Sequence, residues 1–368
     1  MIKASIIENS RKEKTTQVDY NGFIGSCPSG ASTGKNETPI FRKKIDTEVK
    51  EFNQIAKSLE KIEINKFGDL KLIEEKLKDF GANIIISTEF AILHSKQGYK
   101  WINSLIDFPK PLGNVIGGGA HFKGKGTSFQ EFLVVDNNSK SFLDSSLTNK
   151  KIHLELREEL EVYDNKFNGE MTDEGAWAPT QLEDEDVLKI VFNVAKKYNA
   201  NIGLDIASSQ FFKDGKYHYR KNVLTKDEQI DFVNSLIKKY NLFYVEDPLD
   251  ETDFEGFSYI HKKGLIVGDD LTCTKKELLQ KAVHYNSINS LIIKPNQVGS
   301  LVKMKETVEY AQANKIKTVF SHRSGETMDT ALSHLALGFN ADFLKVSVLG
   351  KEREAKIKEI IKIEKSFS

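Results

Sequence analysis

The sequence contains little cysteine. Among its 368 residues only Cys27 and Cys273 are found, far apart and without a Cys-x-x-Cys pair or a histidine at metal-ligand spacing. This pattern argues against a disulfide framework and against a structural zinc site. Thiols without disulfide partners are typical of a reducing compartment, so we expect a cytoplasmic protein.

The sequence also lacks a net charge and long apolar runs. Lys plus Arg and Asp plus Glu both number 53, so the formal net charge at pH 7 is +0. No long-range attraction to nucleic acid or to an anionic membrane is predicted, and an anionic ligand must be held locally. The longest apolar runs, such as residues 84–86, are far shorter than the ~20 residues of a membrane-spanning helix. The first residues carry no continuous apolar segment, so we expect neither export nor membrane insertion.

The chain is long enough to bury one large core and one smaller core. Helical periodicity occurs at 46–61 and 69–80, and a more apolar segment at 84–95 suggests a buried helix. A turn-rich loop, CPSGASTGKNETP, precedes these segments at 27–39. We predict a small α+β domain over residues 1–108 and a second domain over residues 109–368.

A different rhythm begins at about residue 187, where short β-branched runs alternate with amphipathic segments. The runs that we expect to be strands are 201–207, 242–247, 265–270, 290–295, 318–323 and 342–347. The expected helices are 227–240, 275–285, 301–315, 325–338 and a solvated final helix at 351–365. Consecutive βα units predict an α/β fold, a (β/α)8-like TIM barrel, with a doubly wound open sheet as the alternative.

A chemically active side chain lies at the end of each expected strand. In chain order these residues are Asp205, Glu246, Asp269, Lys294, His322 with Arg323, and Lys345. Barrel enzymes build their sites at the carboxyl ends of strands and in the loops that follow. Each residue alone is equally well explained as a solvated loop charge, but six in succession favour one shared site.

The residue types suggest a chemistry for this site. Three carboxylates on neighbouring strands would form an oxygen-rich pocket of the kind that Mg²⁺ prefers. Lys294 and Lys345 would enter the same mouth, where each lowers the pKa of the other and makes one a usable base. Arg323 and Ser324 suit a phosphate group. Alternatively, Ser324 caps a helix that carries Glu326 in its first turn.

Ten segments in order carry a specific resemblance that covers most of the chain. They are PSGASTGKNE, GGGAHF, QEFLVV, TDEGAWAP, GLDIASSQFF, YVEDPLDETDF, VGDDLTCT, IIKPNQVGS, SHRSGET and LKVS with the following KEREAK. On these segments the sequence resembles the enolase family. The resemblance implies an N-terminal α+β capping domain on a TIM barrel. It also implies a hydro-lyase of glycolysis and gluconeogenesis that reversibly dehydrates 2-phosphoglycerate to phosphoenolpyruvate with two Mg²⁺ ions per site.

The resemblance implies the metal ligands position by position. Asp205, Glu246 and Asp269 match the ligands of the first Mg²⁺, and Ser32 in the SGAST loop matches the residue that closes onto the second. Such ions are needed because removing a proton next to a carboxylate creates a dianionic intermediate, whose charge must be offset in the transition state.

The resemblance also implies the groups that move protons and hold the substrate. Lys294 matches the base that removes the C2 proton, and Lys345 matches the lysine that grips the substrate carboxylate. Glu174, with Glu131 as its companion, matches the acid that protonates the departing C3 hydroxyl, and two nearby carboxylates raise one pKa so that a proton is available. The other positions that match substrate contacts are His121, His322, Arg323 and Ser324, the last two at the phosphate.

The sequence departs from the family pattern in several places. The chain is shorter than is typical, and NSRKEKTT replaces the usual DSRGNPT, which puts the capping hairpin in doubt. The single-residue departures near the expected site are Ala176, Gln210, Val346 and Ser347. Glu352 of the family's dimer contact is kept, but Ser5 stands where its arginine partner is expected. We still expect a homodimer or a higher homo-oligomer.

Three alternative functions remain. SGASTGKN looks like a nucleotide-binding loop, but Gly30 and Gly34 enclose three residues instead of four, and Lys35 precedes Asn36 instead of Ser or Thr. GGGAH likewise lacks the spacing of dinucleotide folds. A non-catalytic scaffold with the same fold, or a related lyase acting on a phosphonate or another phosphorylated hydroxy acid, stays open. We expect a small-molecule substrate and neither a nucleic-acid nor a membrane partner.

Overall fold

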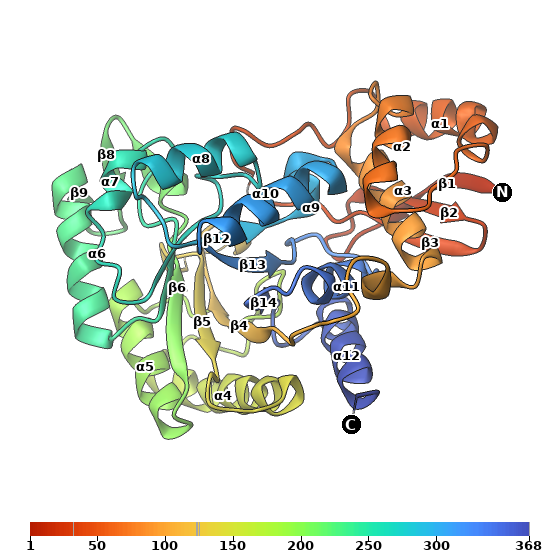
Figure 1. Ribbon diagram of the computed structural model, residues 1–368. Helices are drawn as coiled ribbons and strands as arrows, with labels where there is room; N and C mark the ends of the chain where they lie inside the picture. Colours follow the sequence, from red (N-terminus) through yellow and green to blue (C-terminus); the bar gives the residue numbers. More distant parts are fainter. Residues whose placement is uncertain (32, 123, 125, 368) are drawn as a thin grey trace.

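The computed structural model describes residues 1–31, 33–122, 124 and 126–367. The predicted metal ligand Ser32 lies outside these residues. Figure 1 shows a smaller N-terminal part, which we call the cap, beside a barrel formed by the rest of the chain. The cap contains strands β1 (Ile2–Glu8), β2 (Lys14–Tyr20) and β3 (Phe23–Ser26) and helices α1 (Ile45–Leu59), α2 (Leu70–Lys76) and α3 (Ala82–Ser95). The sequence thus predicted an α+β cap correctly.

The capping hairpin forms despite its unusual sequence. β1 pairs with β2 in antiparallel register from Ile2 opposite Tyr20 to Glu8 opposite Lys14. Residues 9–13 form the turn, in which the side chain of Asn9 accepts hydrogen bonds from two backbone N–H groups of the turn. An asparagine side chain of this kind stabilises a tight turn without the missing glycine and proline.

Helix α3 is the centre of the cap. Its residues from Ala82 to Leu93 are all buried, so the predicted buried helix is confirmed. β3 lies directly on α3, because a Cβ atom on Gly25 would be 2.3 Å from the backbone oxygen of Ser87. The predicted helix at 69–80 is shorter than expected, since α2 ends at Lys76.

Among the described residues, eight strands close into a barrel in the order β10-β11-β12-β13-β14-β4-β5-β6. They are β4 (Lys110–Gly117), β5 (Glu131–Val135), β6 (Asn201–Asp205), β10 (Tyr244–Glu246), β11 (Leu265–Gly268), β12 (Ser290–Ile293), β13 (Lys317–Ser321) and β14 (Phe343–Lys345). The TIM barrel and all six predicted strands are confirmed, and the open-sheet alternative is wrong.

Strands β4 and β5 were not predicted from the sequence pattern. β5 is antiparallel to both of its neighbours, whereas the other neighbouring pairs in the barrel are parallel. The barrel therefore begins with a hairpin instead of a βα unit. The division of the chain after residue 108 stays a prediction, although β4 begins at Lys110.

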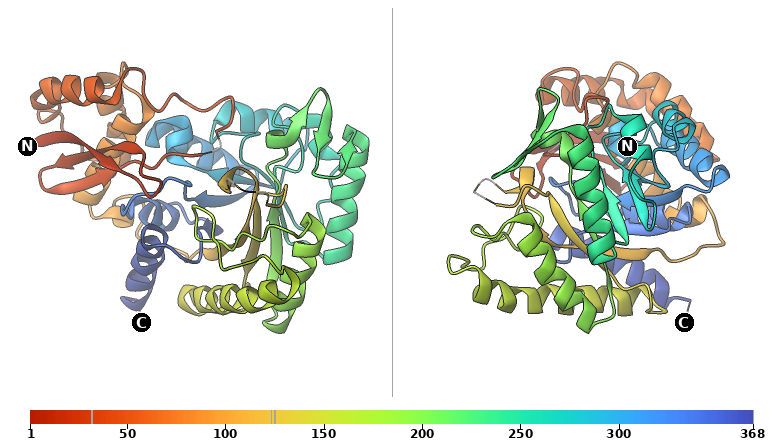
Figure 2. Two further views of the ribbon diagram at one scale, coloured as in Figure 1. Left: turned by 180° about the vertical axis from the view of Figure 1, so that it is seen from behind. Right: turned by 90° about the vertical axis from the view of Figure 1, so that its left-hand side faces the viewer.

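Helices surround the barrel, as both views of Figure 2 show. They are α4 (Phe142–Tyr163), α5 (Asp184–Lys197), α6 (Lys226–Tyr240), α7 (Phe254–Ser258), α8 (Lys276–His284), α9 (Pro295–Val298), α10 (Leu301–Ala313), α11 (Ala331–Gly338) and α12 (Lys351–Lys365). A small antiparallel sheet of β7 (Phe212–Lys213), β8 (Lys216–His218) and β9 (Val223–Leu224) lies outside the barrel. The cap packs on the barrel through α3 against α9 and α11.

Two helix predictions need correction. The segment predicted as a helix over 325–338 is helical only from Ala331, because residues 325–330 are tied to the cap instead. The final helix α12 was expected to be solvated, yet it buries Arg353 and Lys356 together with Ile360 and Ile363. The buried charge of Lys356 is paired with Glu326 at 2.7 Å.

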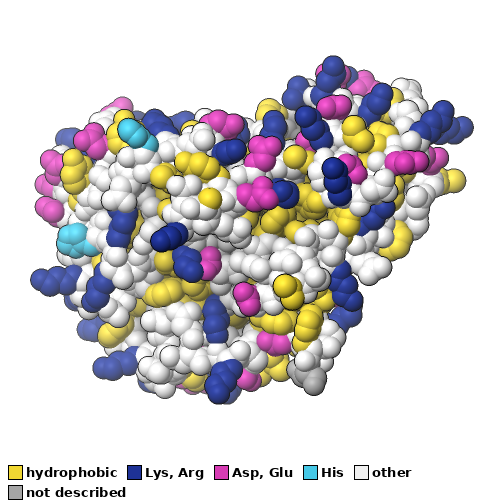
Figure 3. Space-filling view, viewed as in Figure 1, with side chains coloured by type: hydrophobic (Ala, Val, Ile, Leu, Met, Phe, Trp, Pro, Cys, Tyr) yellow, Lys and Arg dark blue, Asp and Glu magenta, His cyan; other side chains and the backbone are white. Residues whose placement is uncertain are grey.

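The exterior agrees with the balanced composition. Lys and Arg side chains alternate with Asp and Glu over the face shown in Figure 3. No helix within the described ranges is both long and apolar enough to cross a membrane.

Candidate active site

The alternation of side chains along the strands places the polar residues. An apolar cluster that includes Tyr244, Val267, Ile292 and Phe343 draws residues from neighbouring barrel strands. Side chains two positions apart in a strand point to the same face. The polar residues that lie two positions further along are Glu246, Asp269, Lys294 and Lys345. The sequence therefore directs these groups to one end of the barrel interior.

Lys345 is the centre of one charged cluster. Its Nζ atom lies 2.9 Å from Asp205 Oδ2, 2.7 Å from Glu246 Oε2 and 3.2 Å from Glu131 Oε2. β5, β6 and β10 are neighbours whose register aligns Glu131 with Asp205 and Asp205 with Glu246. Burial alone would lower the pKa of Lys345, but the three surrounding carboxylates raise it well above its usual value.

Lys294 belongs to a second cluster at the same mouth. Its ammonium group forms an ion pair with Asp269, whose other oxygen accepts a hydrogen bond of 2.8 Å from Gln297. Burial and the nearby cations Arg323 and Lys345 lower the pKa of Lys294, but the adjacent Asp269 carboxylate outweighs them and leaves this pKa raised. Lys345 thus lowers the pKa of Lys294 as expected, but the net shift is upward, so the expected lowering toward a usable base is not seen in this structure.

The three predicted ligands Asp205, Glu246 and Asp269 all reach the mouth, but in this structure they contact the lysines. Among the described residues, Asp247, Asp269 and Asp270 each place a carboxylate oxygen within 4.8 Å of the others at this side of the mouth. Asp247 also accepts the backbone N–H groups of residues 269 and 270, at 3.0 and 2.8 Å. Sequence analysis missed Asp247 and Asp270.

The donor chemistry of the mouth fits a hard divalent cation. Burial and the nearby charge of Asp205 raise the pKa of Glu246 to about 8, and burial with the nearby carboxylates raises the pKa of Asp247 and of Asp270 well above the usual value. This buried group of carboxylates is only partly neutralised by lysine. Carboxylate oxygens are the ligands that Mg²⁺ and Ca²⁺ prefer.

Glu131 and Glu174 face the same histidine on the other side of the mouth. The Nε2 atom of His121 lies 3.7 Å from an oxygen of each glutamate. Glu174 also accepts a hydrogen bond of 3.1 Å from Asn114 and lies 3.4 Å from His322 Nε2. The predicted pair is therefore brought together, and both predicted histidines lie beside it.

The two glutamates differ in their ionisation. Burial raises the pKa of Glu131, as does the charge of Glu174, and Lys345 does not overcome this effect. Burial alone would raise the pKa of Glu174, but the nearby His121 and His322 have a larger effect in the opposite direction. The pKa of Glu174 therefore lies well below its usual value. The predicted splitting of the pair is confirmed, but the raised pKa belongs to Glu131 and not to Glu174.

Comparison with known proteins decides the family. The family model described as "Enolase, C-terminal TIM barrel domain" matches residues 105–368. The enolase of Methanosphaera stadtmanae is 36% identical over 397 residues, which cover 98% of this chain and 95% of that protein. The enolase of Methanothermobacter thermautotrophicus is 35% identical over 402 residues, covering 100% of this chain and 96% of the relative.

The chain belongs to the enolase family. The hydro-lyase class that the sequence predicted is thereby confirmed, as is the family resemblance. Of the departures from the enolase pattern, Ser347 is buried and donates a hydrogen bond of 3.4 Å to the backbone oxygen of Asn114, whose side chain in turn donates to Glu174.

In this member of the enolase family Arg323 is fully engaged. Its guanidinium donates to the Glu37 carboxylate at 3.0 and 3.1 Å and to Asn296 Oδ1 at 3.2 Å. Burial alone would lower the pKa of Arg323, but the charge of Glu37 raises it. Sequence analysis missed Glu37, because no pattern shows that two residues 286 positions apart form an ion pair.

Ser324 does not cap a helix, so that alternative is wrong. Its Oγ atom accepts a hydrogen bond of 2.6 Å from the backbone N–H of Ala31, and Ser29 pairs with Gly325 in both directions at 2.8 and 2.9 Å. Further along, the backbone N–H of Lys35 donates to Glu251 at 3.0 Å. The loop after β3 is thus fastened to the barrel mouth beside the enolase site.

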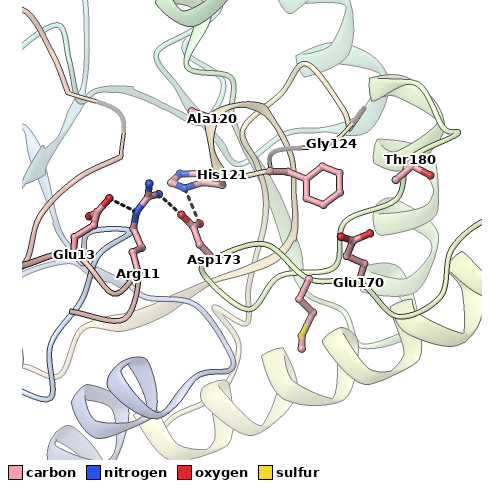
Figure 4. Close-up of a pocket in the computed structure, with 10 residues that line it drawn as sticks. Arg11, Glu13, Ala120, His121, Gly124, Glu170, Asp173 and Thr180 are labelled. Carbon is pink, nitrogen blue, oxygen red and sulfur yellow. Dashed lines mark hydrogen bonds and ion pairs between the residues drawn. The ribbon is translucent and has the colours of Figure 1, made fainter. Parts of the chain in front are cut away.

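A pocket of about 650 Å³ opens next to His121. Figure 4 shows Asp173 between Arg11 of the capping hairpin and the imidazole of His121, with Glu170 and Thr180 on the far side. The Nδ1 atom of His121 donates to Asp173 Oδ1 at 3.2 Å, and the Arg11 guanidinium forms an ion pair with Asp173 Oδ2. Arg11 and Asp173 also escaped sequence analysis. Asp173 lies in the matching segment TDEGAWAP, whereas Arg11 lies in NSRKEKTT, where the sequence departs from the family pattern.

Proposed function

We propose that this protein is an enolase that reversibly dehydrates 2-phospho-D-glycerate to phosphoenolpyruvate with the help of Mg²⁺. Membership of the family supports the reaction. The single observation that carries the proposal for this chain is the meeting of two ammonium groups and two sets of carboxylates at one barrel mouth. Lys345 contacts Asp205, Glu246 and Glu131 there, and Lys294 contacts Asp269.

Asp205, Glu246 and Asp269 are the residues that would hold the first metal ion, and Ser32 would serve a second. A bound divalent cation would stabilise the negative charge that develops on the substrate carboxylate. Asp247 and Asp270 support this assignment, because they surround Asp269 with further oxygen donors.

Lys294 is the proposed base for the C2 proton, and Lys345 the group that binds the substrate carboxylate. In the present structure both ammonium groups are paired with carboxylates. The base must be neutral to accept a proton, so the Asp269 carboxylate has to be drawn away from Lys294 before the reaction. Asp269 is also a proposed metal ligand, which would provide that exchange of partners.

Lys294, the proposed base, and Glu131, the companion of the proposed acid Glu174, belong to opposite sides of the barrel. Lys294 follows β12 and Glu131 begins β5, and these strands are four positions apart in either direction around the ring of eight. An elimination in which C2 is deprotonated on one face and the C3 hydroxyl is protonated on the other requires such an arrangement. We assign Glu174, with Glu131 and the neighbouring His121 and His322, to the hydroxyl side.

Arg323 and Ser324 would bind the phosphate group. Arg323 presents two terminal nitrogens to the carboxylate of Glu37, and the same planar fork is suited to a phosphate. Both residues lie next to the loop that carries Ser29 and Ala31. The substrate would therefore be enclosed between the barrel and this loop.

The test follows the rise in ultraviolet absorbance that accompanies formation of the enol product. Purified protein is mixed with 2-phosphoglycerate and Mg²⁺, and in parallel with excess EDTA. Turnover that EDTA abolishes supports the proposal. Turnover of a phosphonate or of another phosphorylated hydroxy acid, without turnover of 2-phosphoglycerate, favours the related lyase. A protein that binds Mg²⁺ but turns over none of these compounds favours the scaffold.

We also propose that the protein is a cytoplasmic homodimer or higher homo-oligomer. The retention of Glu352 supports a dimer, and Ser5 in place of the family's arginine argues for a weaker one. Light scattering coupled to size-exclusion chromatography measures the assembly, and a monomer at micromolar concentration would contradict the proposal.

A further inference from the structure

The turn of the capping hairpin is fixed to the mouth of the barrel. Ser10 Oγ donates to the backbone oxygen of Ser324 at 3.1 Å and accepts from the N–H of Glu326 at 3.0 Å. It also accepts a hydrogen bond of 2.9 Å from the buried guanidinium of Arg353. The next residue, Arg11, is therefore held at a defined place beside the site.

Arg11 continues this contact to the loop that carries Glu174. Its guanidinium pairs with Asp173 through one nitrogen, while its Nε atom donates to Glu13 at 3.2 Å. About one fifth of the Arg11 and Asp173 side chains is exposed, 20% and 21%. This ion pair is largely shielded from solvent, and each partner makes a further hydrogen bond, Arg11 to Glu13 and Asp173 to His121. It is therefore more strongly ordered than an ordinary surface ion pair.

Asp173 connects Arg11 to His121. One carboxylate oxygen of Asp173 accepts from Arg11 and the other accepts from His121 Nδ1 at 3.2 Å, as Figure 4 shows. The opposite nitrogen of the same ring, Nε2, lies 3.7 Å from both Glu131 and Glu174. The imidazole is thus clamped on one edge and presented to the glutamate pair on the other.

We propose that Arg11 and Asp173 are positioning residues that act through His121. The proposal rests on the proposed function, since it names residues that support the acid side of the same site. Asp173 fixes the tautomer in which Nδ1 carries a proton, so that Nε2 faces the glutamates, and it fixes the plane of the ring. A carboxylate hydrogen-bonded to one nitrogen of a histidine is a general means of setting the role of the other nitrogen. Arg11 holds Asp173 in the orientation that this requires.

A consequence is that the cap supplies part of the acid side of the site. Arg11 belongs to the hairpin between β1 and β2, Asp173 to the loop between α4 and α5, and His121 to the connection between β4 and β5. The geometry of His121 is therefore complete only when the hairpin is docked. Positioning groups of this kind contribute to the rate without touching the substrate.

The experiment compares R11Q, D173N and the conservative variant R11K with the control K12Q. Lys12 lies in the same turn as Arg11, and its side chain is exposed. We expect R11Q and D173N to lower kcat about 10–100-fold, as loss of such outer partners does, with less than about a threefold change in KM. R11K should recover part of the loss, and K12Q should stay close to wild type. A kcat for R11Q and D173N equal to that of K12Q would overturn the proposal.

A double-mutant cycle with His121 separates positioning from a general structural role. In an H121N background, D173N should have almost no further effect on kcat, because the residue through which it acts is gone. If D173N lowers kcat by the same factor in both backgrounds, Asp173 acts by another route and the proposal is wrong.

A readout without turnover distinguishes this proposal from the proposed function. The ¹⁵N chemical shifts of the His121 ring report which nitrogen carries the proton. The wild type should show a protonated Nδ1, and D173N should shift the proton distribution while its thermal unfolding midpoint stays unchanged. Identical ring shifts in the wild type and D173N would refute the role of Asp173. Absence of 2-phosphoglycerate turnover by the wild type would refute the proposed function alone.

Discussion

The carboxylate of Glu37 accepts hydrogen bonds from both terminal nitrogens of Arg323, at 3.0 and 3.1 Å, although the two residues belong to the cap and the barrel. The same two nitrogens are those that we assign to the substrate phosphate. Glu37 therefore occupies, from within the chain, the donors that an anionic ligand requires.

Replacing Glu37 by Gln should strengthen phosphate binding. The neutral amide competes less well for the guanidinium, because a hydrogen bond between two charged groups is stronger than one to a neutral group. We expect inorganic phosphate to bind about tenfold more tightly, which corresponds to ~1.4 kcal/mol. Calorimetric titration measures this affinity, and E51Q, which removes a surface charge in α1, is the control. Weaker binding in E37Q would mean that Glu37 positions Arg323 instead of competing for it.

Lys294→Ala should abolish the reaction while leaving metal binding largely intact. Loss of a positioned base costs about 10²–10⁴-fold or more in rate. The absorbance assay measures the rate, and calorimetry with Mg²⁺ alone measures the metal affinity. A rate near that of the wild type would show that another group removes the C2 proton.

Asp269→Ala should weaken Mg²⁺ binding even when no substrate is present. The loss should exceed the ~10–100-fold that removal of an outer partner of a metal site causes. Titration with the metal alone gives this number without reference to turnover, and D231N on the exposed side of α6 is the control. Unchanged Mg²⁺ affinity in D269A would remove Asp269 from the ligand set.

Lys356→Met should destabilise the fold. Lys356 and Glu326 are each 2% exposed and lie 2.7 Å apart, so that the substitution leaves a buried carboxylate without its cation. Such a loss costs about 3–5 kcal/mol. Urea unfolding measures it, with K358M on the exposed face of α12 as the control, expected within about 0.5 kcal/mol of wild type. The double variant K356M/E326Q should recover part of the loss, and no recovery would contradict the assignment to the ion pair.

Acid should destabilise the protein through His334. Burial, and to a smaller extent the charge of His94, lowers the pKa of His334 to about 4 from the usual 6.5. The unfolded chain therefore binds a proton near pH 6.5 that the folded protein binds only near pH 4. The stability that this group contributes is complete above pH 6.5 and is lost as the pH falls toward 4.

The size of this effect can be checked by urea unfolding at pH 7 and pH 5. The contribution of His334 to the loss of unfolding free energy over that interval is roughly 2 kcal/mol. The charged groups around it are His94 and Asp329, which form an ion pair with each other, and Glu359, 3.6 Å from His334 Nε2. Burial alone would lower the pKa of His94, but Asp329 raises it above the usual value. Protonation of His94 therefore favours the folded protein as the pH falls, opposite to the effect of His334. H334N should lose less stability than wild type, and an equal loss would exclude His334.

The sequence predicted those parts of the fold in which local pattern and tertiary environment agree. The strands that end in Asp205, Glu246 and Lys345 are short β-branched runs flanked by amphipathic helices, and the barrel uses them as such. β4 and β5 escaped prediction because both precede residue 187, where the regular alternation of strands and helices begins. The reversed direction of β5 is a property of the hairpin connection and leaves no periodic trace.

The sequence predicted the candidate site only in part. Residues at the ends of strands could be found because a barrel brings those ends together. The residues that form ion pairs and hydrogen bonds with them in the structure could not be predicted. Glu37 and Arg11 reach the mouth through loops whose paths depend on packing between the cap and the barrel, and Gln297 reaches it from the short helix α9. The sense of the pKa shifts of Lys294 and Glu131 depends on distances that no sequence pattern contains.

The hydrogen bond between Ser10 and Arg353 joins residues that are 343 positions apart. During synthesis the hairpin emerges 343 residues before its partner on α12, so this contact cannot form when the hairpin first appears. Contacts of such sequence separation slow folding, since a long loop must close before they form. We therefore expect nascent chains that do not yet contain α12 to expose the rim of the mouth and to depend on chaperones until α12 is made.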